Sequence, residues 1–432
     1  MKLTIHREAL GIGGGCVELS SEKTRILIDF GMPPADGKRE PFDTKLLEGK
    51  TVAELKGSGL LPNIQGLYND EPRGVDAILI SRSSRDYYGL LGYVNPDIPV
   101  YMSCGIKALI DASNIFIHNR PGRIHAQIIK GRRPFKIGDL TVTPYLADDS
   151  GAGAQAFLIE AGGKRLFYSG DIRGHGKKGV LFRTIFERPP ENIDCLLLGG
   201  AMRGTDEQAY KNEAAVKRRI EEILRANVSI VLICCSSQDI DRLASAYRAC
   251  QKAGRTFVID LHTAFILSKL GKDSAGLPQP DGKNVRIKFV NTQAESLKDA
   301  GYRDLLFVYN KSKIEFFKIN EEKHKMLMLV RDTGSFPVIP KELEETKGAK
   351  LIYSMCEKSL TGEFRASCDR RGIEIEQVHT CGSDTIDDLK AFVEVLKPKT
   401  LLPMDAFGPE QYSEAFAGAD VKVLQEGRTF TL

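Results

Sequence analysis

Short apolar runs separated by glycine turns dominate the first half of the chain. Residues 3–29 follow the order strand, Gly-rich turn, strand, and Gly105–His118 has helical character. The further predicted strands are Ala77–Ser81, Val100–Ser103, Leu140–Leu146, Ala156–Glu160, Arg165–Ser169 and Cys195–Leu198. This alternation of strands, hairpins and helices predicts an α/β sandwich whose loops at one sheet edge carry the site.

A different rhythm begins near Glu207 and indicates a second domain. The predicted elements there are a helix at 207–226, a buried strand at 228–235, a helix at 238–253 and a strand at 256–261. Helix and strand alternate with the period of a parallel doubly wound sheet. The domains expected from this pattern are a first domain at 1–205, an inserted doubly wound domain at 206–354, and a return to the first domain at 355–432.

Composition and charge place few limits on function. The 432 residues are 42% hydrophobic and 27% charged, which is ordinary for a globular protein of more than one domain. The net charge of +4 does not demand a nucleic-acid partner, and the nine cysteines lack paired metal-ligand spacing, so we expect reduced thiols. The sequence contains no apolar signal core and no apolar run of about 18 residues, which favours a cytoplasmic protein that does not cross a membrane.

A polar turn after the predicted strand Ala77–Ser81 carries the strongest motif. It reads Ser-Arg-Ser-Ser-Arg-Asp-Tyr-Tyr-Gly and resembles the Ser-His-x-His-x-Asp-His-x-Gly turn of the metallo-beta-lactamase superfamily, which binds one or two zinc ions. The resemblance puts Arg82 and Ser84 at the first two histidine positions. Asp86 matches the aspartate, and Tyr87 replaces the third histidine. Arginine stays protonated and neutral serine is a poor ligand, so the usual zinc site is not expected.

Further blocks resemble the RNase J-like branch of this superfamily, in which a beta-CASP domain is inserted into the hydrolase fold. These blocks lie at residues 167–173, 235–242, 258–264, 351–355 and 379–390. The resemblance spans nearly the whole chain. It implies an αββα sandwich with an inserted doubly wound α/β domain of the beta-CASP type.

The remaining metal positions of the branch can be assigned to this chain one at a time. The resemblance puts Asp149 and Asp405 at two histidine positions, and it retains the bridging aspartate as Asp171. In the His-x-Ser-Gly-His block of the branch, His379 is kept and Ser383 replaces the second histidine. Two nitrogen ligands have therefore been replaced by carboxylates.

Two interpretations of this site remain open. In one, Arg82 occupies the space of the first metal and pairs with the carboxylates, which leaves a pseudoenzyme. In the other, Asp86, Asp171 and Asp405 hold one Mg or Mn ion, because carboxylate oxygens suit hard cations. The chain would then be an active phosphodiesterase or nuclease, and its catalytic candidates are Asp86, Asp171 and His379. Neither interpretation includes zinc, and apart from the single Mg or Mn ion of the second one no cofactor is expected.

The partners expected from the resemblance are single-stranded RNA or a nucleotide, or else a protein such as an active relative. The candidate contacts to phosphate or RNA are Arg132, Arg133, Arg173, Ser354 and Ser383. A solvated basic face explains the arginines equally well, and turn capping explains Ser354. Members of the branch often form homodimers, but the sequence reveals no self-complementary surface.

Overall fold

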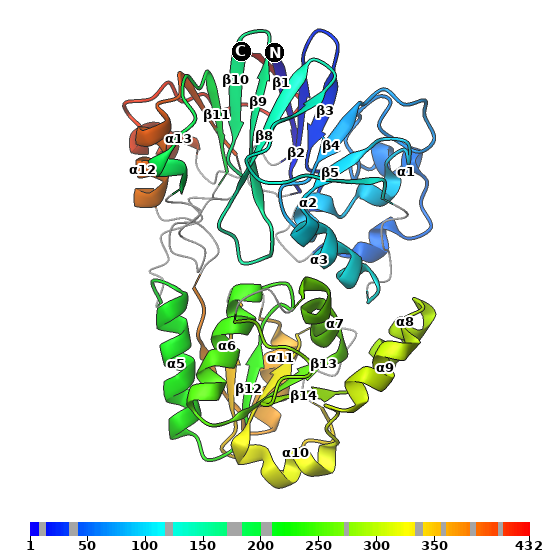
Figure 1. Cartoon of the computed structure of the whole chain (residues 1–432), viewed down its shortest axis with the longest axis vertical. Helices are drawn as coiled ribbons and strands as arrows, with labels where there is room; N and C mark the ends of the chain where they lie inside the picture. The colour runs from blue at the N-terminus through cyan, green and yellow to red at the C-terminus, as the bar shows by residue number, and fades with distance from the viewer. Residues whose placement is uncertain are drawn as a thin grey trace. The chain divides into compact units, whose positions relative to one another are not determined.

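The computed structural model describes most of the chain, and its contacts divide the chain into two units. The described residues are 1–7, 14–33, 42–116, 124–170, 184–199, 210–271, 276–332, 340–355, 360–380, 386–404 and 409–432. The first unit comprises 1–107, 118–205 and 382–432, and the second comprises 108–117 and 206–381. Both units mix strands and helices (Figure 1), so the α/β class predicted from the sequence is confirmed.

The first unit contains two sheets. The first has the order β19-β1-β2-β3-β4-β5-β6, antiparallel from β19 to β3 and parallel from β3 to β6. Its strands are β1 (Lys2–Arg7), β2 (Cys16–Ser20), β3 (Arg25–Ile28), β4 (Ala77–Leu79), β5 (Val100–Met102), β6 (Ala126–Ile128) and β19 (Thr429–Thr431).

The second sheet of this unit has the order β18-β11-β10-β9-β8-β7. Its strands are β7 (Phe135–Ile137), β8 (Leu140–Leu146), β9 (Gln155–Ala161), β10 (Lys164–Tyr168), β11 (Cys195–Leu198) and β18 (Thr400–Pro403). Strand β18 comes from the last part of the chain and pairs with β11 in parallel. The C-terminal segment is therefore built into the sheet of the first unit.

Alternating side chains of the second sheet enter two different cores. Phe157 and Ile159 of β9 join residues of the first sheet, such as Ile5, in one fully buried cluster. Ala156 and Leu158 point to the opposite face, where α12 (Ile386–Leu396) and α13 (Pro409–Ala415) cover the sheet. Because successive side chains of β9 point to opposite faces, one face of the second sheet packs on the first sheet and the other face is covered by helices (Figure 1).

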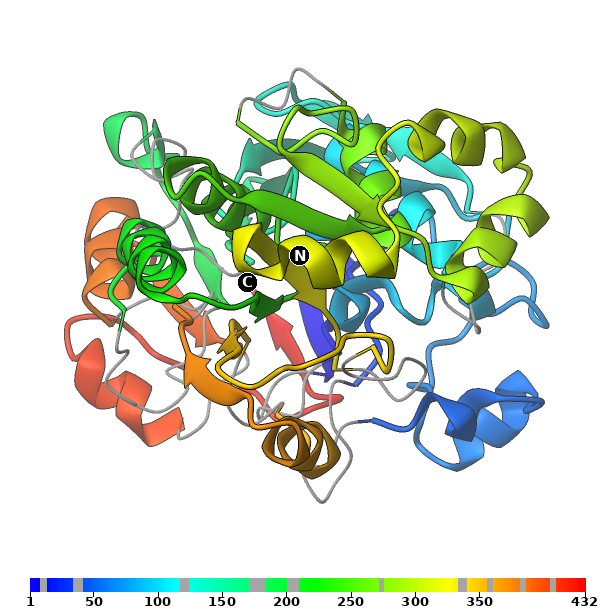
Figure 2. The same cartoon turned by 90° about the horizontal axis from the view of Figure 1, so that it is seen from below.

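The second unit is built on a six-stranded parallel sheet with the order β14-β13-β15-β12-β16-β17. Its strands are β12 (Val231–Cys234), β13 (Thr256–Asp260), β14 (Val285–Lys288), β15 (Met326–Val330), β16 (Lys350–Tyr353) and β17 (Glu374–Gln377). Its helices include α5 (Glu213–Ala226), α6 (Ile240–Lys252), α7 (Leu261–Leu270), α8 (Asn291–Asp299), α9 (Arg303–Asn310), α10 (Phe316–Glu322) and α11 (Gly362–Arg370). Figures 1 and 2 show helices on both faces of this sheet. The central strands β12 and β15 are buried along their whole length, which explains their continuous apolar sequences, whereas the edge strands β14 and β17 carry charged residues.

The boundary predicted at residue 354 differs from the structure. Residues 360–380 belong to the second unit, because β17 pairs with β16 and Phe364 of α11 is buried in the same core. The return to the first unit begins at residue 382. Separately, no helix in the described part of the chain combines the length and hydropathy that a membrane span requires.

The motif turn is held against the end of β3 by backbone contacts. Phe30 donates its N–H to the carbonyl of Tyr87 at 2.9 Å, and Met32 donates to the carbonyl of Arg85 at 3.0 Å. Gly31 lies between them, and a Cβ there would stand 1.6 Å from the carbonyl oxygen of Asp86. This close approach of two backbone segments requires glycine.

Replacing Gly31 therefore tests how the turn is positioned. Gly31→Ala is expected to lower the free energy of unfolding of the first unit by about 3 kcal/mol or more, because rigid backbone must move. The measurement is urea denaturation. The matched control is Gly57→Ala at the end of α1 (Val52–Gly57), where a Cβ meets nothing within 4 Å. The control should change stability by less than about 1 kcal/mol. Equal effects at both glycines would contradict the steric explanation.

Candidate functional site

The motif turn connects β4 to the short helix α2 (Arg85–Tyr88), and its first basic side chain, Arg82, contacts Asp149 and Tyr87. The guanidinium of Arg82 donates to Oδ2 of Asp149, and its Cζ lies 4.7 Å from the centre of the Tyr87 ring. The Arg82 and Asp149 side chains are only 12% and 13% exposed. A charge-assisted hydrogen bond and a cation–π contact therefore hold Arg82 in a largely dry position.

The loop that carries Asp149 is fixed by short polar contacts. Oδ1 of Asp149 accepts the N–H of Gly151 at 2.7 Å, and Oγ of Ser103 donates to the carbonyl of Gly153 at 2.7 Å. Gly153 has a φ of +78°. The carboxylate thus meets Arg82 from a preformed turn, and less side-chain entropy is lost when the pair forms.

A fully buried carboxyl group lies beside this turn. Asp29 accepts the N–H and the hydroxyl of Ser81 and the hydroxyl of Tyr168, each at 2.7 Å. Ser81 follows β4 of the first sheet and Tyr168 ends β10 of the second, so Asp29 joins the two sheets. Burial raises the pKa of Asp29 to about 7, although the hydrogen bonds and the charge of Arg82 oppose this rise.

The other predicted motif residues lie on or near α2. Ser84 is exposed at the N-cap position of α2, and its side chain caps no backbone N–H. Asp86 is in the first turn, and Tyr87 is buried. The predicted residues Asp171, Arg173, Ser383 and Asp405 lie outside the described residues. Within the described ranges, no three His, Cys, Asp or Glu side chains come together as a metal-binding group.

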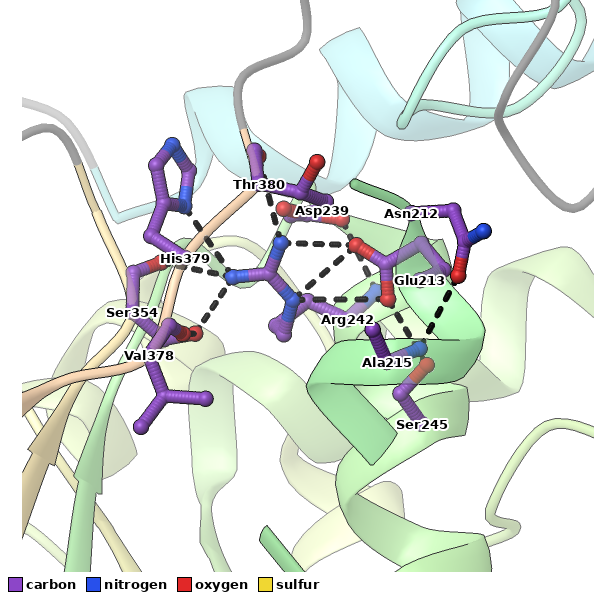
Figure 3. Close-up of polar contacts among 10 residues, drawn as sticks. All are labelled: Asn212, Glu213, Ala215, Asp239, Arg242, Ser245, Ser354, Val378, His379 and Thr380. Atoms are coloured by element: carbon purple, nitrogen blue, oxygen red, sulfur yellow. Dashed lines mark hydrogen bonds and ion pairs between the residues drawn. The ribbon is translucent and has the colours of Figure 1, made fainter. Parts of the chain in front are cut away.

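A second cluster lies in the other unit, around a buried ion pair. Arg242 of α6 and Glu213 of α5 are 1% and 3% exposed, and Nη2 of Arg242 lies 2.6 Å from Oε1 of Glu213. Oγ of Ser245 donates to the other carboxylate oxygen at 2.7 Å. Figure 3 shows the guanidinium at the centre, with Glu213 on one side and Ser354 and His379 on the other.

Ser354 and His379, two residues singled out in the sequence, belong to this cluster. Nη1 of Arg242 donates to the carbonyl of Ser354 at 3.1 Å and lies 3.1 Å from Nδ1 of His379. Because a guanidinium can only donate, Nδ1 is the acceptor and Nε2 carries the proton. Burial, followed by the charge of Arg242, lowers the pKa of His379 to about 4. This histidine is neutral at physiological pH.

The basic residues Arg132 and Arg133 lie in the turn between β6 and β7. Arg132 donates Nη2 to the carbonyl of Thr184 at 2.9 Å, and its guanidinium lies 5.5 Å from the centre of the Tyr145 ring. Both arginines are exposed. Arg132 is thus anchored within its own unit while one side remains open to solvent.

Two features were missed from the sequence. Asp29 ends the Ile-Leu-Ile-Asp-Phe-Gly strand, so its place beside the site could have been inferred from the motif. The Glu213–Arg242 pair gives no comparable signal, because charged residues on predicted helices usually face solvent.

Comparison with known proteins bears on the fold. No family model matches this chain, and no curated protein matches it. Among solved structures, the chain is similar to the crystal structure of a protein of unknown function from Enterococcus faecalis V583, with a TM-score of 0.78 and 19% sequence identity. The similarity covers 100% of this chain and 99% of that chain. At this identity the comparison shows a shared mixed α/β fold.

The Arg82–Asp149 contact can be measured with a double-mutant cycle. Arg82→Met, Asp149→Asn and the double variant should give a coupling energy of about 1–3 kcal/mol in urea denaturation, because the pair is largely desolvated. The control cycle uses Arg225 and Glu221 on α5, a pair whose arginine is 59% exposed. That pair should give about 0.3–0.5 kcal/mol. Coupling no larger than that of the control would rule out a stabilising ion pair.

The pKa of His379 predicts a pH-dependent stability. The folded-state pKa of about 4 is below the ordinary value of 6.5, so the unfolded chain takes up a proton first as the pH falls. Wild-type stability should drop by about 2–3 kcal/mol between pH 6.5 and pH 4 from this residue. His379→Gln should remove that part of the drop, whereas the exposed control His324→Gln should keep it. Identical pH profiles for wild type and His379→Gln would show that the prediction is wrong.

Proposed function

We propose that this chain is an RNase J-like protein of metallo-beta-lactamase and beta-CASP architecture that has lost the dinuclear zinc site. In this proposal the protein is a pseudoenzyme that binds RNA, a nucleotide or a protein partner. The observation that carries the proposal is the ion pair between Arg82 and Asp149. In the family that the sequence resembles, both positions hold histidine ligands.

The residues at these positions do not fit zinc. A guanidinium keeps its proton under all physiological conditions and offers only donors, so Arg82 cannot supply a lone pair to a metal. Its positive charge also occupies the space beside Asp149 and satisfies that carboxylate. Tyr87 packs its ring against Arg82 and is 3% exposed, so a buried aromatic ring takes the place of the third histidine.

The arrangement is suited either to binding an anion or to stabilising the loops around it. Asp149 balances the charge of Arg82, and burial raises the pKa of Asp29 to about 7, so Asp29 is only partly ionised near neutral pH and the site carries less negative charge than its aspartates suggest. A site with this balance can tolerate a phosphate group without a metal to neutralise it. Exposed Arg132 and Arg133 add positive charge to the same unit.

The competing function is an active phosphodiesterase or nuclease that uses one Mg or Mn ion. Asp86, Asp171 and Asp405 would be its ligands, and such an ion would activate water and polarise a phosphate. Of these three ligands, Asp86 lies in the first turn of α2, next in sequence to Tyr87, whose ring contacts Arg82. Its two companions lie outside the described residues.

One experiment separates these functions. Purified full-length protein is analysed for bound metals and then incubated with 5′-phosphorylated single-stranded RNA, with and without Mg²⁺ or Mn²⁺. A pseudoenzyme should bind the RNA in fluorescence anisotropy and leave it intact under every condition. Cleavage that depends on the metal and disappears in Asp171→Ala would establish the competing function. Two tightly bound zinc ions would overturn the proposal.

The RNA interface makes a separate prediction. Reversing Arg132 and Arg133 to glutamate should weaken RNA binding by more than about tenfold, and the slope of log affinity against log salt should shrink by about 0.7 for each lost phosphate contact. The control reverses exposed Lys2 and Arg428, which changes the net charge by the same amount. Equal weakening in the two variants would indicate that only overall charge matters, and unchanged affinity would exclude this surface.

A further inference from the structure

A pocket in the second unit lies apart from the Glu213–Arg242 cluster. It has a volume of about 370 Å³ and opens at the carboxyl ends of β13, β14 and β15. Charged and polar side chains at strand ends line one part, and apolar side chains line another. The residues that matter for its chemistry are Asp260, Lys288, Gln293, Phe316, Met328 and Arg331.

The topology of the sheet explains why a pocket forms there. Strand β14 lies at the edge of the sheet next to β13, and the chain then crosses to β15 on the other side of β13. Because parallel crossovers are right-handed, the connections after β13 and β14 leave the sheet on opposite faces. Connections that diverge in this way leave a crevice at the carboxyl ends of the strands, where doubly wound proteins bind ligands.

Lys288 provides an uncommitted positive charge in this pocket. It is the last residue of β14, and its Nζ lies 4.3 Å from the centre of the Phe316 ring. Within the described residues its ammonium group has neither a hydrogen bond nor an ion pair of its own. Burial lowers the pKa of Lys288 to about 8, while the charges of Glu342 and Asp260 work in the opposite direction.

The other charges of the pocket are already paired or exposed. Arg331 contacts Asp260 through Nε at 2.6 Å and through Nη2 at 3.0 Å, so these two charges neutralise each other. Gln293 donates to the same carboxylate at 2.8 Å. Glu342 is exposed to solvent. Lys288 is therefore the cation that remains available for a ligand.

The first turn of α8 adds hydrogen-bond donors to the same pocket. Helix α8 begins at Asn291, and Val290 at the N-cap offers no side chain that could cap it. The backbone N–H groups of Asn291, Thr292 and Gln293 have no carbonyl partner within the helix. All three residues line the pocket, so these donors and the positive end of the helix lie on the same cavity as Lys288.

We propose that this pocket binds a small organic ligand through an oxyanion, with Lys288 and the first-turn amides of α8 as the donors. Phe316 and Met328 pack against the apolar part of the ligand. The oxyanion is a tetrahedral phosphate or sulfate group, or a planar carboxylate. This site is independent of the motif turn in the first unit, and it does not rest on the function proposed above.

The test measures the reactivity of Lys288 in the full-length protein. The protein is acetylated with an N-hydroxysuccinimide ester, and the rate at each lysine is followed by mass spectrometry. Sulfate is added in one arm, acetate in the second, and chloride at matched ionic strength in the third. Sulfate, acetate or both should slow acetylation of Lys288 by about fivefold or more relative to chloride, because a bound oxyanion engages the amine. The exposed Lys252 should not be slowed.

The arms and variants have distinct outcomes. Protection by sulfate alone indicates a tetrahedral ligand, and protection by acetate alone indicates a carboxylate. Lys288 reactivity that is the same in all three arms would overturn the proposal. Asn291→Pro removes one amide donor at the first helical position, where proline is tolerated and the extended Val290 is compatible with it. This variant should lose most of the protection, and full protection in it would refute the assignment of the helix amides.

A binding measurement checks the same site through its charge. Lys288→Met keeps the apolar stem and removes the ammonium group, so it should weaken sulfate or acetate binding by about tenfold in calorimetry. Lys252→Met is the matched control and should bind as the wild type does. Sulfate affinity should also fall as the pH rises through 8, since Lys288 then loses its proton while sulfate keeps its charge. Affinity that is independent of both Lys288 and pH would exclude the lysine.

Discussion

A permanent positive charge in a largely dry turn constrains the site of the first unit. The guanidinium of Arg82 cannot lose its proton, so the surrounding residues must compensate its charge. Asp149 does this directly, Tyr87 contributes the face of its ring, and Asp29 lies close enough for the charge of Arg82 to affect its pKa. The turn, the Asp149 loop and the strand end at Asp29 are therefore linked through one side chain.

The same residues also connect the two sheets of the first unit. Asp29 receives hydrogen bonds from Ser81 after β4 and from Tyr168 at the end of β10, so a fully buried carboxyl group bridges the layers. Gly31 lets the next backbone segment lie against α2. Because the site shares these contacts with the core, a change in Arg82 affects the fold as well as any ligand.

Much of the fold could be predicted from the sequence, and the exceptions have physical causes. Strands Leu140–Leu146 and Cys195–Leu198 were predicted with their observed bounds, because alternating or continuous apolar runs define them. The contacts group residues 360–380 with the second unit and not with the first, a difference the sequence does not reveal, since Phe364 and Cys368 mark a helix that packs on a sheet without identifying which sheet. Glu213 and Arg242 lie 29 positions apart on two different helices, and no local pattern distinguishes their pair from a solvated face.

The pairing of charges also shows where the second unit can still bind a ligand. Arg242 binds Glu213 and the carbonyl of Ser354, and its charge adds to the burial that keeps His379 neutral, so this group is committed to the fold. Arg331 is committed in the same way to Asp260. A buried ion pair that is fully hydrogen-bonded offers little further attraction to an anion, because its field is already compensated. Lys288 differs from both arginines, since its partly buried ammonium group faces a cavity and an aromatic ring. A partly buried cation without a partner gains more free energy from a bound anion than a paired cation does. This difference favours the end of β14 as the ligand site of the second unit.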